Sequence, residues 1–318
     1  SQGGTDLFAQ ASILSLYDPD RSSTITELGQ VRPWSGFVAA IRGALSAQAA
    51  TKGAGLRILT ETVNSPALAA QIQQILAAHP EARWVQWEPT TRDNVRAGAR
   101  AAFGAFVEPV YDFTKADVIL SLDADFLAAE NAFGVKYARA FASRRRLDTA
   151  PERMSRLYVA EATPSITGGR ADHRLAMKAS QVEVFARAVA ARLGVNGVTG
   201  GAPAGTEALV DAIAADLAAH RGTSLVVAGE AQPAAVHALA HAINDMLGNA
   251  GQTVSYLPTP EVVPSEQHAA MRQLVVDMDA GRVQALLIVG EANPVFSAPA
   301  DWKFAEVLQK VAWRAHTG

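Results

Sequence analysis

ADVILSLDADF, at residues 116–126, and VQALLIVGEANP, at residues 283–294, decide the fold of this chain. Each is a run of β-branched residues and leucines that ends in an acidic or amide turn ahead of a helix. Unbroken apolar runs of this length are typical of parallel strands buried on both faces. Ligands of open α/β sheets bind at the carboxyl ends of such strands, where turns expose backbone N–H groups. Both turns are therefore candidate ligand sites, and simple chain reversal is the alternative.

The rest of the chain alternates short apolar strands with helices. One helix start is explicit, because Ser65 is a good N-cap and Pro66 suits the first helical position. Alternation of this kind predicts an α/β fold of doubly wound, mainly parallel sheets covered on both faces. We expect strands at 56–60, 84–87, 118–122, 157–160, 225–227, 253–257 and 285–289, and helices at 34–50, 66–79, 91–103, 133–143, 181–193, 207–217, 234–247, 265–280 and 301–310.

At 318 residues the chain exceeds the usual size of a single hydrophobic core, so we expect two lobes. The stretch 196–205 is rich in glycine and contains Pro203, which indicates a linker. The predicted organisation is a polar lead with a first helix packing on a lobe (1–50), a first lobe (51–195), this linker and a second lobe (206–318). The chain lacks a starting Met and stops shortly after a further strand begins at Val311, so we expect a fragment of a longer protein.

Composition excludes several classes of function. The chain contains no cysteine, which rules out disulfides, iron–sulfur ligation and thiolate metal ligands within it. With a net charge of −3, the chain lacks the polybasic surface whose positive potential would attract nucleic acid or anionic lipid. No apolar stretch approaches the roughly 18–20 residues of a membrane span. The basic run Arg144–Arg146 is expected to cap a helix end rather than to form a binding patch.

The common one-motif enzyme signatures are missing, including dinucleotide and phosphate-loop glycine patterns and H-E-x-x-H. Asp123 and Asp125 follow a buried strand, where capping of the next helix is favoured over a metal or acid–base pair. His237 and His241 lie four residues apart on one helix, and a surface position is favoured over metal binding. Gly248–Gln252 (GNAGQ) follows a helix, so it is expected to end that helix in left-handed conformation rather than to bind phosphate.

Several segments, taken in order, resemble the molybdopterin oxidoreductase superfamily of the dimethyl-sulfoxide-reductase type. Its pattern Y-x-P-D-R before a tryptophan-led helix is similar to Tyr17–Arg21 ahead of Trp34. Its A-D-x-I-x-x-x-G-x-N-P corresponds to the stretch from Ala116, and a later family turn is kept as Gly290–Pro294. Its D-P-R-x-T-x-T-A-x-x-A-D corresponds to Glu161–Asp172, and its G-N-x-G is similar to Gly248–Gly251. The resemblance spans nearly the whole chain, and its specificity comes from the order of the motifs.

The departures from the family pattern concern cofactor binding. Family members usually carry cysteines for a [4Fe–4S] centre and a Cys, selenocysteine or Ser ligand to molybdenum, whereas here only Asp93 lies near the comparable place. The first G-x-N-P turn has become Asp123-Ala124-Asp125, whose charges would repel a phosphate-bearing group. The family's guanine-reading P-G-T-D corresponds to Ala179–Val182. Valine at that point would leave guanine amide groups unpaired, at a cost of about 1–3 kcal/mol.

One branch fits these departures. The iron–sulfur B subunit of alternative complex III, a quinol-oxidising respiratory assembly, resembles this chain through FAQASILSLYDPDRS, ADVILSLDADF and RLYVAEATPSITGGRADHRL. In that branch a molybdopterin-like domain without molybdenum precedes the part of the chain that carries the iron–sulfur clusters. The resemblance implies that this chain is such a domain, peripheral on the periplasmic face of the inner membrane, with other subunits of the electron-transfer complex as partners and no binding of nucleic acid.

The resemblance implies a non-catalytic scaffold with no catalytic residue, no metal and no cofactor of its own, and with iron–sulfur clusters only outside these residues. Two alternatives stay open. One is a catalytic oxidoreductase domain that binds a molybdenum bis-pterin-guanine-dinucleotide cofactor. The other is a phosphate- or nucleotide-binding protein in which only the second turn, Gly290–Pro294, binds the ligand. The residues implied to line the cofactor crevice, or its remnant, are Gly290, Asn293, Pro294, Thr163, Thr167 and Asp172.

Overall fold

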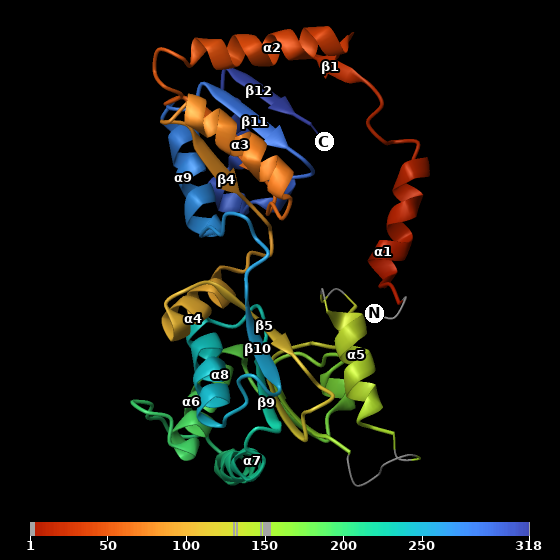
Figure 1. Cartoon of the computed structure of the whole chain (residues 1–318). Helices are drawn as coiled ribbons and strands as arrows, with labels where there is room; N and C mark the ends of the chain where they lie inside the picture. The colour runs from red at the N-terminus through yellow and green to blue at the C-terminus, as the bar shows by residue number, and fades with distance from the viewer. Residues whose placement is uncertain (1–3, 130, 132, 147, 149–153, 318) are drawn as a thin grey trace. The chain divides into compact units, whose positions relative to one another are not determined.

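The computed structural model describes residues 4–129, 131, 133–146, 148 and 154–317 (Figure 1). The chain divides into two compact units, each formed from two separate segments. Unit 1 comprises residues 1–17 and 94–259, and unit 2 comprises residues 18–93 and 260–318. All five tryptophans lie in unit 2 and all five tyrosines lie in unit 1. The two units therefore have separate spectroscopic reporters.

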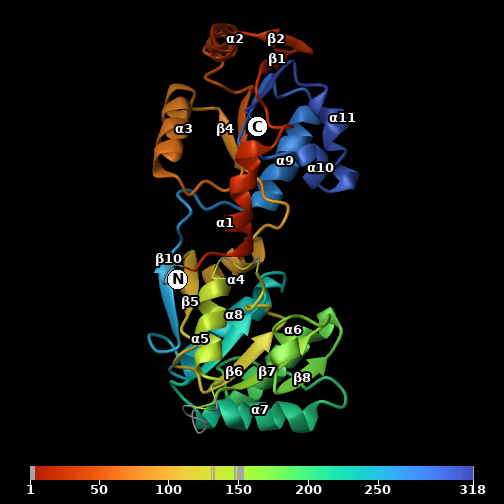
Figure 2. The same cartoon turned by 90° about the vertical axis from the view of Figure 1, so that its right-hand side faces the viewer.

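Unit 1 is built on a four-stranded parallel sheet in the order β8-β7-β6-β9. Its strands are β6 (Val118–Leu122), β7 (Arg156–Glu161), β8 (His173–Ala176) and β9 (Ser224–Ala228). Figure 2 shows β6, β7 and β8 side by side. Every residue of β6 is buried, as its uninterrupted apolar sequence predicts for a central strand. The predicted mainly parallel α/β sheet is confirmed.

Alternate residues of the β6 strand face two different cores. Val118, Leu120 and Leu122 pack with α6 (Ala179–Leu193), α7 (Glu207–Ala219) and α8 (Ala234–Met246). Ile119 packs on the opposite face with α5 (Gly134–Ser143) and the aromatic residues Phe113 and Phe126. A two-stranded antiparallel ribbon of β5 (Val107–Tyr111) and β10 (Val254–Pro258) also belongs to unit 1. Helices thus cover both faces of the sheet, which leaves the two ends of its strands as the places where a ligand could reach it.

Unit 2 is built on a second four-stranded parallel sheet, in the order β12-β11-β3-β4. Its strands are β3 (Leu56–Thr60), β4 (Arg83–Gln86), β11 (Ala285–Val289) and β12 (Trp313–His316). The main hydrophobic core of unit 2 is formed by residues of this sheet, of α9 (Gln267–Asp279) and of α11 (Phe304–Leu308). A further long helix, α3 (Pro66–Ala78), also belongs to unit 2. The predicted start of α3 is confirmed, because the Ser65 side chain accepts a hydrogen bond from Leu68 N–H.

The remaining elements are mostly short. They are α1 (Leu7–Ala11), η1 (Ser12–Tyr17), β1 (Ile25–Glu27), β2 (Gln30–Arg32), α2 (Trp34–Ala47), α4 (Asp93–Phe103), η3 (Gly168–Arg170), α10 (Pro294–Ser297) and η4 (Ala300–Trp302). The lead through α2 is exposed or half-buried almost throughout, and α2 buries no residue fully. Within the described ranges, no helix has the length and apolar character that a membrane crossing requires.

The predicted division of the chain at 196–205 is wrong, although two units are present. Strand β9 follows this stretch and pairs in parallel with β6, which precedes it. The stretch connects α6 to α7, and both helices pack in the same core. Its glycines and proline therefore make a loop inside unit 1. The chain instead passes between units at Tyr17–Asp18, Asp93–Asn94 and Thr259–Pro260, so the predicted first lobe joined strands that belong to different units.

Candidate functional site

Strand order places a candidate crevice at the carboxyl end of β6 and β9. The chain runs from β6 through β7 to β8 and then returns to the other side of β6, so the winding direction reverses between β6 and β9. In open α/β sheets such a reversal point is the usual place of ligand binding. The residues that follow the two strands here are Asp123 and Gly229. We call this place the unit 1 switch point.

Asp123 ties together the three strand ends that meet at the unit 1 switch point. Its carboxylate accepts hydrogen bonds from Ala162 N–H after β7, at 3.2 Å, and from Gln232 Nε2 after β9, at 2.7 Å. Gly229 packs so closely that a Cβ there would lie 2.0 Å from the Asp123 carbonyl oxygen. The crevice is filled by the side chain and backbone of the protein itself.

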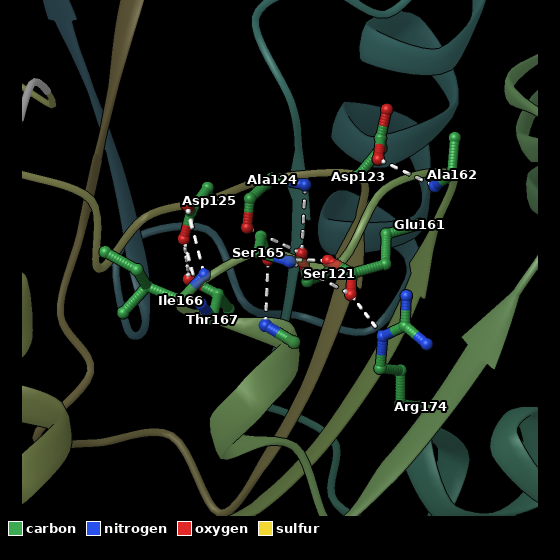
Figure 3. A network of polar contacts seen from close by, with 11 residues as sticks. Ser121, Asp123, Ala124, Asp125, Glu161, Ala162, Ser165, Ile166, Thr167 and Arg174 are labelled. Carbon is green, nitrogen blue, oxygen red and sulfur yellow. Dashed lines mark hydrogen bonds and ion pairs between the residues drawn. The ribbon is translucent and has the colours of Figure 1, made fainter.

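Asp125 extends in the other direction, toward the loop after β7 (Figure 3). Its Oδ1 accepts hydrogen bonds from Thr167 N–H at 2.9 Å and from Thr167 Oγ1 at 2.6 Å. Its Oδ2 accepts a longer bond from Ile166 N–H at 3.4 Å. Thr167 is fully buried, and its hydroxyl oxygen in turn accepts a hydrogen bond from Leu127 N–H at 3.1 Å. The loop after β7 is thus fastened to the turn after β6.

Glu161, the last residue of β7, is the third carboxylate of this cluster and is 1% exposed. It forms a short ion pair with Arg174 and accepts a 2.5 Å hydrogen bond from Ser165 Oγ. Ser165 Oγ also accepts a hydrogen bond from Gly168 N–H. A Cβ on Gly168 would overlap the Glu161 carboxylate. The three carboxylates Asp123, Asp125 and Glu161 therefore accept hydrogen bonds from four residues of the following loop, namely Ala162, Ser165, Ile166 and Thr167.

The predicted role of Asp123 and Asp125 as caps of the following helix is wrong. The next helix, α5, begins at Gly134, and its N-cap Phe133 makes no side-chain cap hydrogen bond. Both aspartates instead bind the loop of the neighbouring strand, because parallel strands bring their carboxyl ends to one edge.

Among the residues that the structure describes, no group of three or more His, Asp or Glu side chains is arranged to hold a metal ion.

Three of the predicted crevice residues lie in unit 1, and the structure brings only two of them to the same edge. Thr167 binds Asp125, and Thr163 lies exposed on the same loop. Asp172 lies at the opposite end of β7, where it accepts a hydrogen bond from Leu157 N–H and pairs with both Nη atoms of Arg145 at 2.7 and 2.8 Å. Although partial burial opposes ionisation, these partners lower the pKa of Asp172. Asp172 thus stabilises the amino end of the sheet.

The other three predicted residues, Gly290, Asn293 and Pro294, lie together after β11 in unit 2. Unit 2 also has a switch point, between β3 and β11. Gly290 has a left-handed φ of 85°, its N–H donates to Thr317 Oγ1 at 3.2 Å, and its carbonyl lies 2.9 Å from His316 Nε2. Asn293 is the N-cap of α10 and Pro294 is its first residue. The backbone of this turn is therefore engaged with β12 and its end.

The unit 2 switch point is acidic. Glu61 follows β3 directly, Glu88 lies just after β4, and Glu291 follows Gly290. Burial raises the pKa of Glu61, and the negative charges of Glu88 and Glu291 raise it further. The backbone N–H of Thr62 donates to Glu88 Oε1 at 3.0 Å. Sequence reasoning missed this cluster, because its three members come from distant segments that only the sheet order brings together.

The interpretation of His237 and His241 as surface residues is wrong. Both are buried, at 4% and 5% exposure. α8 packs closely on α4, where a Cβ on Gly98 would lie 2.3 Å from His237 Cβ. His241 Nδ1 lies 3.3 Å from the Tyr256 hydroxyl, and burial together with His237 lowers the pKa of His241 to about 4. The pair is part of the packing of unit 1.

Three further residues or segments with proposed roles are parts of the scaffold. Arg144, Arg145 and Arg146 pair with Asp117, Asp172 and Asp148, in agreement with a helix end rather than a binding patch. Gly248, at φ 70°, follows the α8 helix in left-handed conformation as predicted. The carboxylate of Asp93, the weak candidate metal ligand, accepts hydrogen bonds from Gln267 and His268 N–H at 3.0 and 2.9 Å. It thereby caps the start of α9.

The two units with their parallel sheets define an α/β fold of the molybdopterin oxidoreductase type. Acetylene hydratase from Pelobacter acetylenicus shares this fold with a TM-score of 0.67 at 10% identity, over 98% of this chain and 55% of its own. The chain thus spans about half the length of that enzyme.

A structure of the formyltransferase/hydrolase complex from Methylorubrum extorquens in complex with methylofuran matches at a TM-score of 0.48 and 16% identity, over 85% of this chain and 77% of its own. No family profile and no curated protein matches the sequence. At these identities the likeness concerns the fold alone.

The residues at the unit 1 switch point do not fit the phosphate-bearing pterin cofactor that the resemblance implies for active members. Such a group needs free N–H donors and cationic side chains at the strand ends. Here the N–H groups of Ala162, Ile166 and Thr167 already donate to aspartates. Within unit 2 taken by itself, Glu61 and Glu291 at its own switch point would also repel phosphate.

Proposed function

We propose that this chain is a molybdopterin-oxidoreductase-like domain that serves as a non-catalytic scaffold in a respiratory quinol-oxidising complex. In this proposal it holds no molybdenum, its iron–sulfur clusters are bound elsewhere, and other subunits of the complex are its partners on the periplasmic face of the inner membrane. The assignment to the alternative complex III branch rests on the sequence resemblance. The fold is consistent with it, and the chemistry of the switch points supports the loss of the cofactor.

The observation that carries this proposal is the occupation of the unit 1 switch point by Asp123 and Asp125. A family turn that normally offers glycine and amide groups to a cofactor here presents two carboxylates, and both accept hydrogen bonds from the loop after β7. Both aspartates are half-buried, so displacing them would cost each carboxylate its hydrogen-bond donors and would leave the buried donors of Thr167 without an acceptor. A cofactor with its own negative charge cannot offset that cost.

The test is metal and pterin analysis of the native full-length protein in its complex. We expect no stoichiometric molybdenum or tungsten, no pterin fluorescence after oxidation, and no guanine nucleotide released on denaturation, while iron is found at the level of the remaining clusters. Iron serves as the positive control for intact protein. One molybdenum or tungsten atom per chain would refute the scaffold proposal.

A catalytic domain with a bis-pterin-guanine cofactor is the second candidate, and one observation favours it. Gly290 keeps the left-handed φ of 85° and is followed by Asn293-Pro294, as in a cofactor-holding turn. In that case Asn293→Ala would lower cofactor occupancy in the full-length protein, whereas Asn249→Ala, in a buried structural network of unit 1, would lower folded yield without selective loss of cofactor.

The nucleotide-binding alternative is tested in a separate way. GTP or GDP that binds only the folded state would raise the melting temperature with ligand concentration. We expect no such rise for this chain.

A further inference from the structure

The carboxylate of Asp125 is held by hydrogen-bond donors of one loop rather than by a positively charged side chain. Its two oxygens accept from Thr167 N–H, Thr167 Oγ1 and Ile166 N–H. Within the described part of the chain, Asp125 forms no ion pair with Lys, Arg or His. Within the chain, its half-buried negative charge is therefore stabilised by N–H and O–H dipoles. Concave groups of backbone N–H donors of this kind are the usual binding sites of small oxyanions in proteins.

These donors have anchors besides Asp125. The hydroxyl oxygen of Thr167 accepts a hydrogen bond from Leu127 N–H at 3.1 Å, so its proton is directed toward Asp125 Oδ1. The loop itself is anchored by Ser165, whose Oγ contacts Glu161 and Gly168 N–H. Thr167 and Gly168 are both buried. The loop at 165–168 thus has anchors at Leu127 and Glu161 in addition to Asp125.

The neighbouring carboxylates differ in this respect. Glu161 is neutralised by Arg174, and Asp123 is shared between Ala162 N–H and the Gln232 side chain across two loops. Glu161 accepts from Ser165 of the same loop as well as from Arg174, whereas Asp125 accepts from three donors of this loop and, among the described residues, pairs with no cation. Its removal would leave the Thr167 donors buried without a partner, at a cost that an incoming anion can relieve.

We infer that the loop 165–168 is a small-oxyanion site whose present ligand is the Asp125 carboxylate of the same chain. Loss of that carboxylate opens the site to a free oxyanion of the carboxylate or phosphate class. The inference concerns this one loop and does not rest on the proposed function. If molybdenum were found in the native complex, the scaffold proposal would fail while the oxyanion site would be unaffected.

The experiment compares Asp125→Gly with Asp125→Asn in the full 318-residue chain. The glycine variant removes the carboxylate and the Cβ, which leaves room for a whole formate ion. The asparagine variant keeps an oxygen acceptor in the site and so fills it without charge. Melting is followed by tyrosine absorbance, which reports on unit 1, while tryptophan fluorescence reports on unit 2 as an internal control. Far-ultraviolet circular dichroism follows the helices and strands of both units together. Sodium formate is titrated at constant ionic strength against sodium chloride, and inorganic phosphate is used in a second series.

We expect Asp125→Gly to melt at a lower temperature than the wild type and to regain roughly 3–5 °C at a formate concentration of ten times Kd. The wild type and Asp125→Asn should show no specific response, and the tryptophan signal should not move. In the Asp125→Gly background, Thr167→Val should weaken formate binding about tenfold, since one hydrogen bond to a charged group is lost, whereas Thr167→Ser should retain it.

Equal responses to formate and chloride in the glycine variant, or equal responses of all three proteins to formate, would overturn the inference. A response to phosphate but not to formate would overturn the assignment of a carboxylate-sized site while keeping an oxyanion site. If Asp125→Gly does not fold in plain buffer, the readout becomes its refolding yield. Recovery with formate supports the site, and no recovery with either anion refutes it.

Discussion

Asp123 and Gly290 have the same backbone conformation at the same place in their units. Each is the first residue after a central parallel strand, β6 or β11, and each is left-handed, with φ of 57° and 85°. Glycine adopts this conformation without penalty, whereas an ordinary L-residue costs roughly 1–2 kcal/mol, and Asp or Asn costs less because its side chain bonds locally. An aspartate therefore stands at the one position where the turn favours glycine.

Substitutions at Asp123 should separate backbone strain from hydrogen bonding. Asp123→Asn tolerates the left-handed conformation and can still accept from Ala162 N–H, so we expect a small loss of stability. Asp123→Ala loses both side-chain hydrogen bonds and keeps the strain, which should lower the free energy of unfolding of unit 1 by about 2–3 kcal/mol. Urea unfolding followed by circular dichroism measures the difference. Equal stability of the two variants would contradict this account of the turn.

Gly229→Ala should be among the most damaging small substitutions in unit 1. The new Cβ would lie 2.0 Å from the Asp123 carbonyl oxygen, and both groups belong to backbone that is fixed by the sheet. We expect a loss of about 1–3 kcal/mol or more from this overpacking. Gly169→Ala is the matched control, because a Cβ there meets no atom within 4 Å. Thermal melting of the two proteins should differ by several degrees, and similar melting would show that the switch point is looser than described.

The stability of unit 1 should fall between neutral and mildly acidic pH because of His241. Burial and His237 lower its pKa to about 4, below the 6.5 of an exposed histidine. Between these values the unfolded chain binds a proton that the folded chain does not, so stability decreases as pH falls through this window and the loss is complete near pH 4. From pH 7 to pH 5 the contribution is about 2 kcal/mol.

His241→Phe removes this titration while it keeps an aromatic ring against Phe103 and Tyr256. The measurement is the difference between the free energies of unfolding at pH 7 and pH 5, taken from urea curves for each protein. This difference should be smaller in the variant, whatever its absolute stability. An unchanged pH dependence would mean that His241 is not the group responsible.

Unit 2 depends on a buried ion pair at the amino end of its sheet. Arg57 Nη2 lies 2.9 Å from Asp277 Oδ2, and both side chains are about 95% buried. Although burial opposes ionisation, hydrogen bonds from Arg57, Gln273 and Arg282 lower the pKa of Asp277 to about 2. Asp277→Asn leaves a buried guanidinium without its counter-charge and should cost about 3–5 kcal/mol.

Tryptophan fluorescence measures this loss directly, because all the tryptophans belong to unit 2. Asp279→Asn is the matched control two residues along α9, where the pair with Lys310 is exposed, and it should have little effect. A tyrosine-detected change in unit 1 of similar size in Asp277→Asn would contradict the assignment of the effect to unit 2.

The sequence predicted best those elements whose pattern is decided locally. Strands β3, β6 and β11 match their predicted bounds because a short, mainly apolar run between turns has few other solutions, and Ser65 acts as the predicted N-cap. β5 and β8 were missed, since neither has a buried apolar run: the β5 residues are all half-buried, and most of β8 is exposed. Partner strands, rather than their own composition, determine these two.

The candidate site was predictable in position but not in chemistry. The turns after β6 and β11 stand out in the sequence because strand ends of an open sheet have a general role. The partners of Asp123 and Asp125 lie 39–42 residues further along on the loop after β7 and, for Gln232, 109 residues further along after β9, and their proximity depends on strand order. The division of the chain failed for the same reason: a glycine-rich stretch has the same composition whether it joins two domains or two helices of one domain.

Because the two segments of unit 2 flank the main part of unit 1, synthesis of the chain separates the halves of one sheet by nearly two hundred residues. β3 and β4 leave the ribosome before β11, so the edge of β3 that pairs with β11 stays unpaired until residues 285–289 emerge. Unit 1, complete by residue 259, can fold first during this interval. The unpaired β3 edge is then the surface most in need of a chaperone, and truncation before β11 should produce aggregates rather than a stable half-domain.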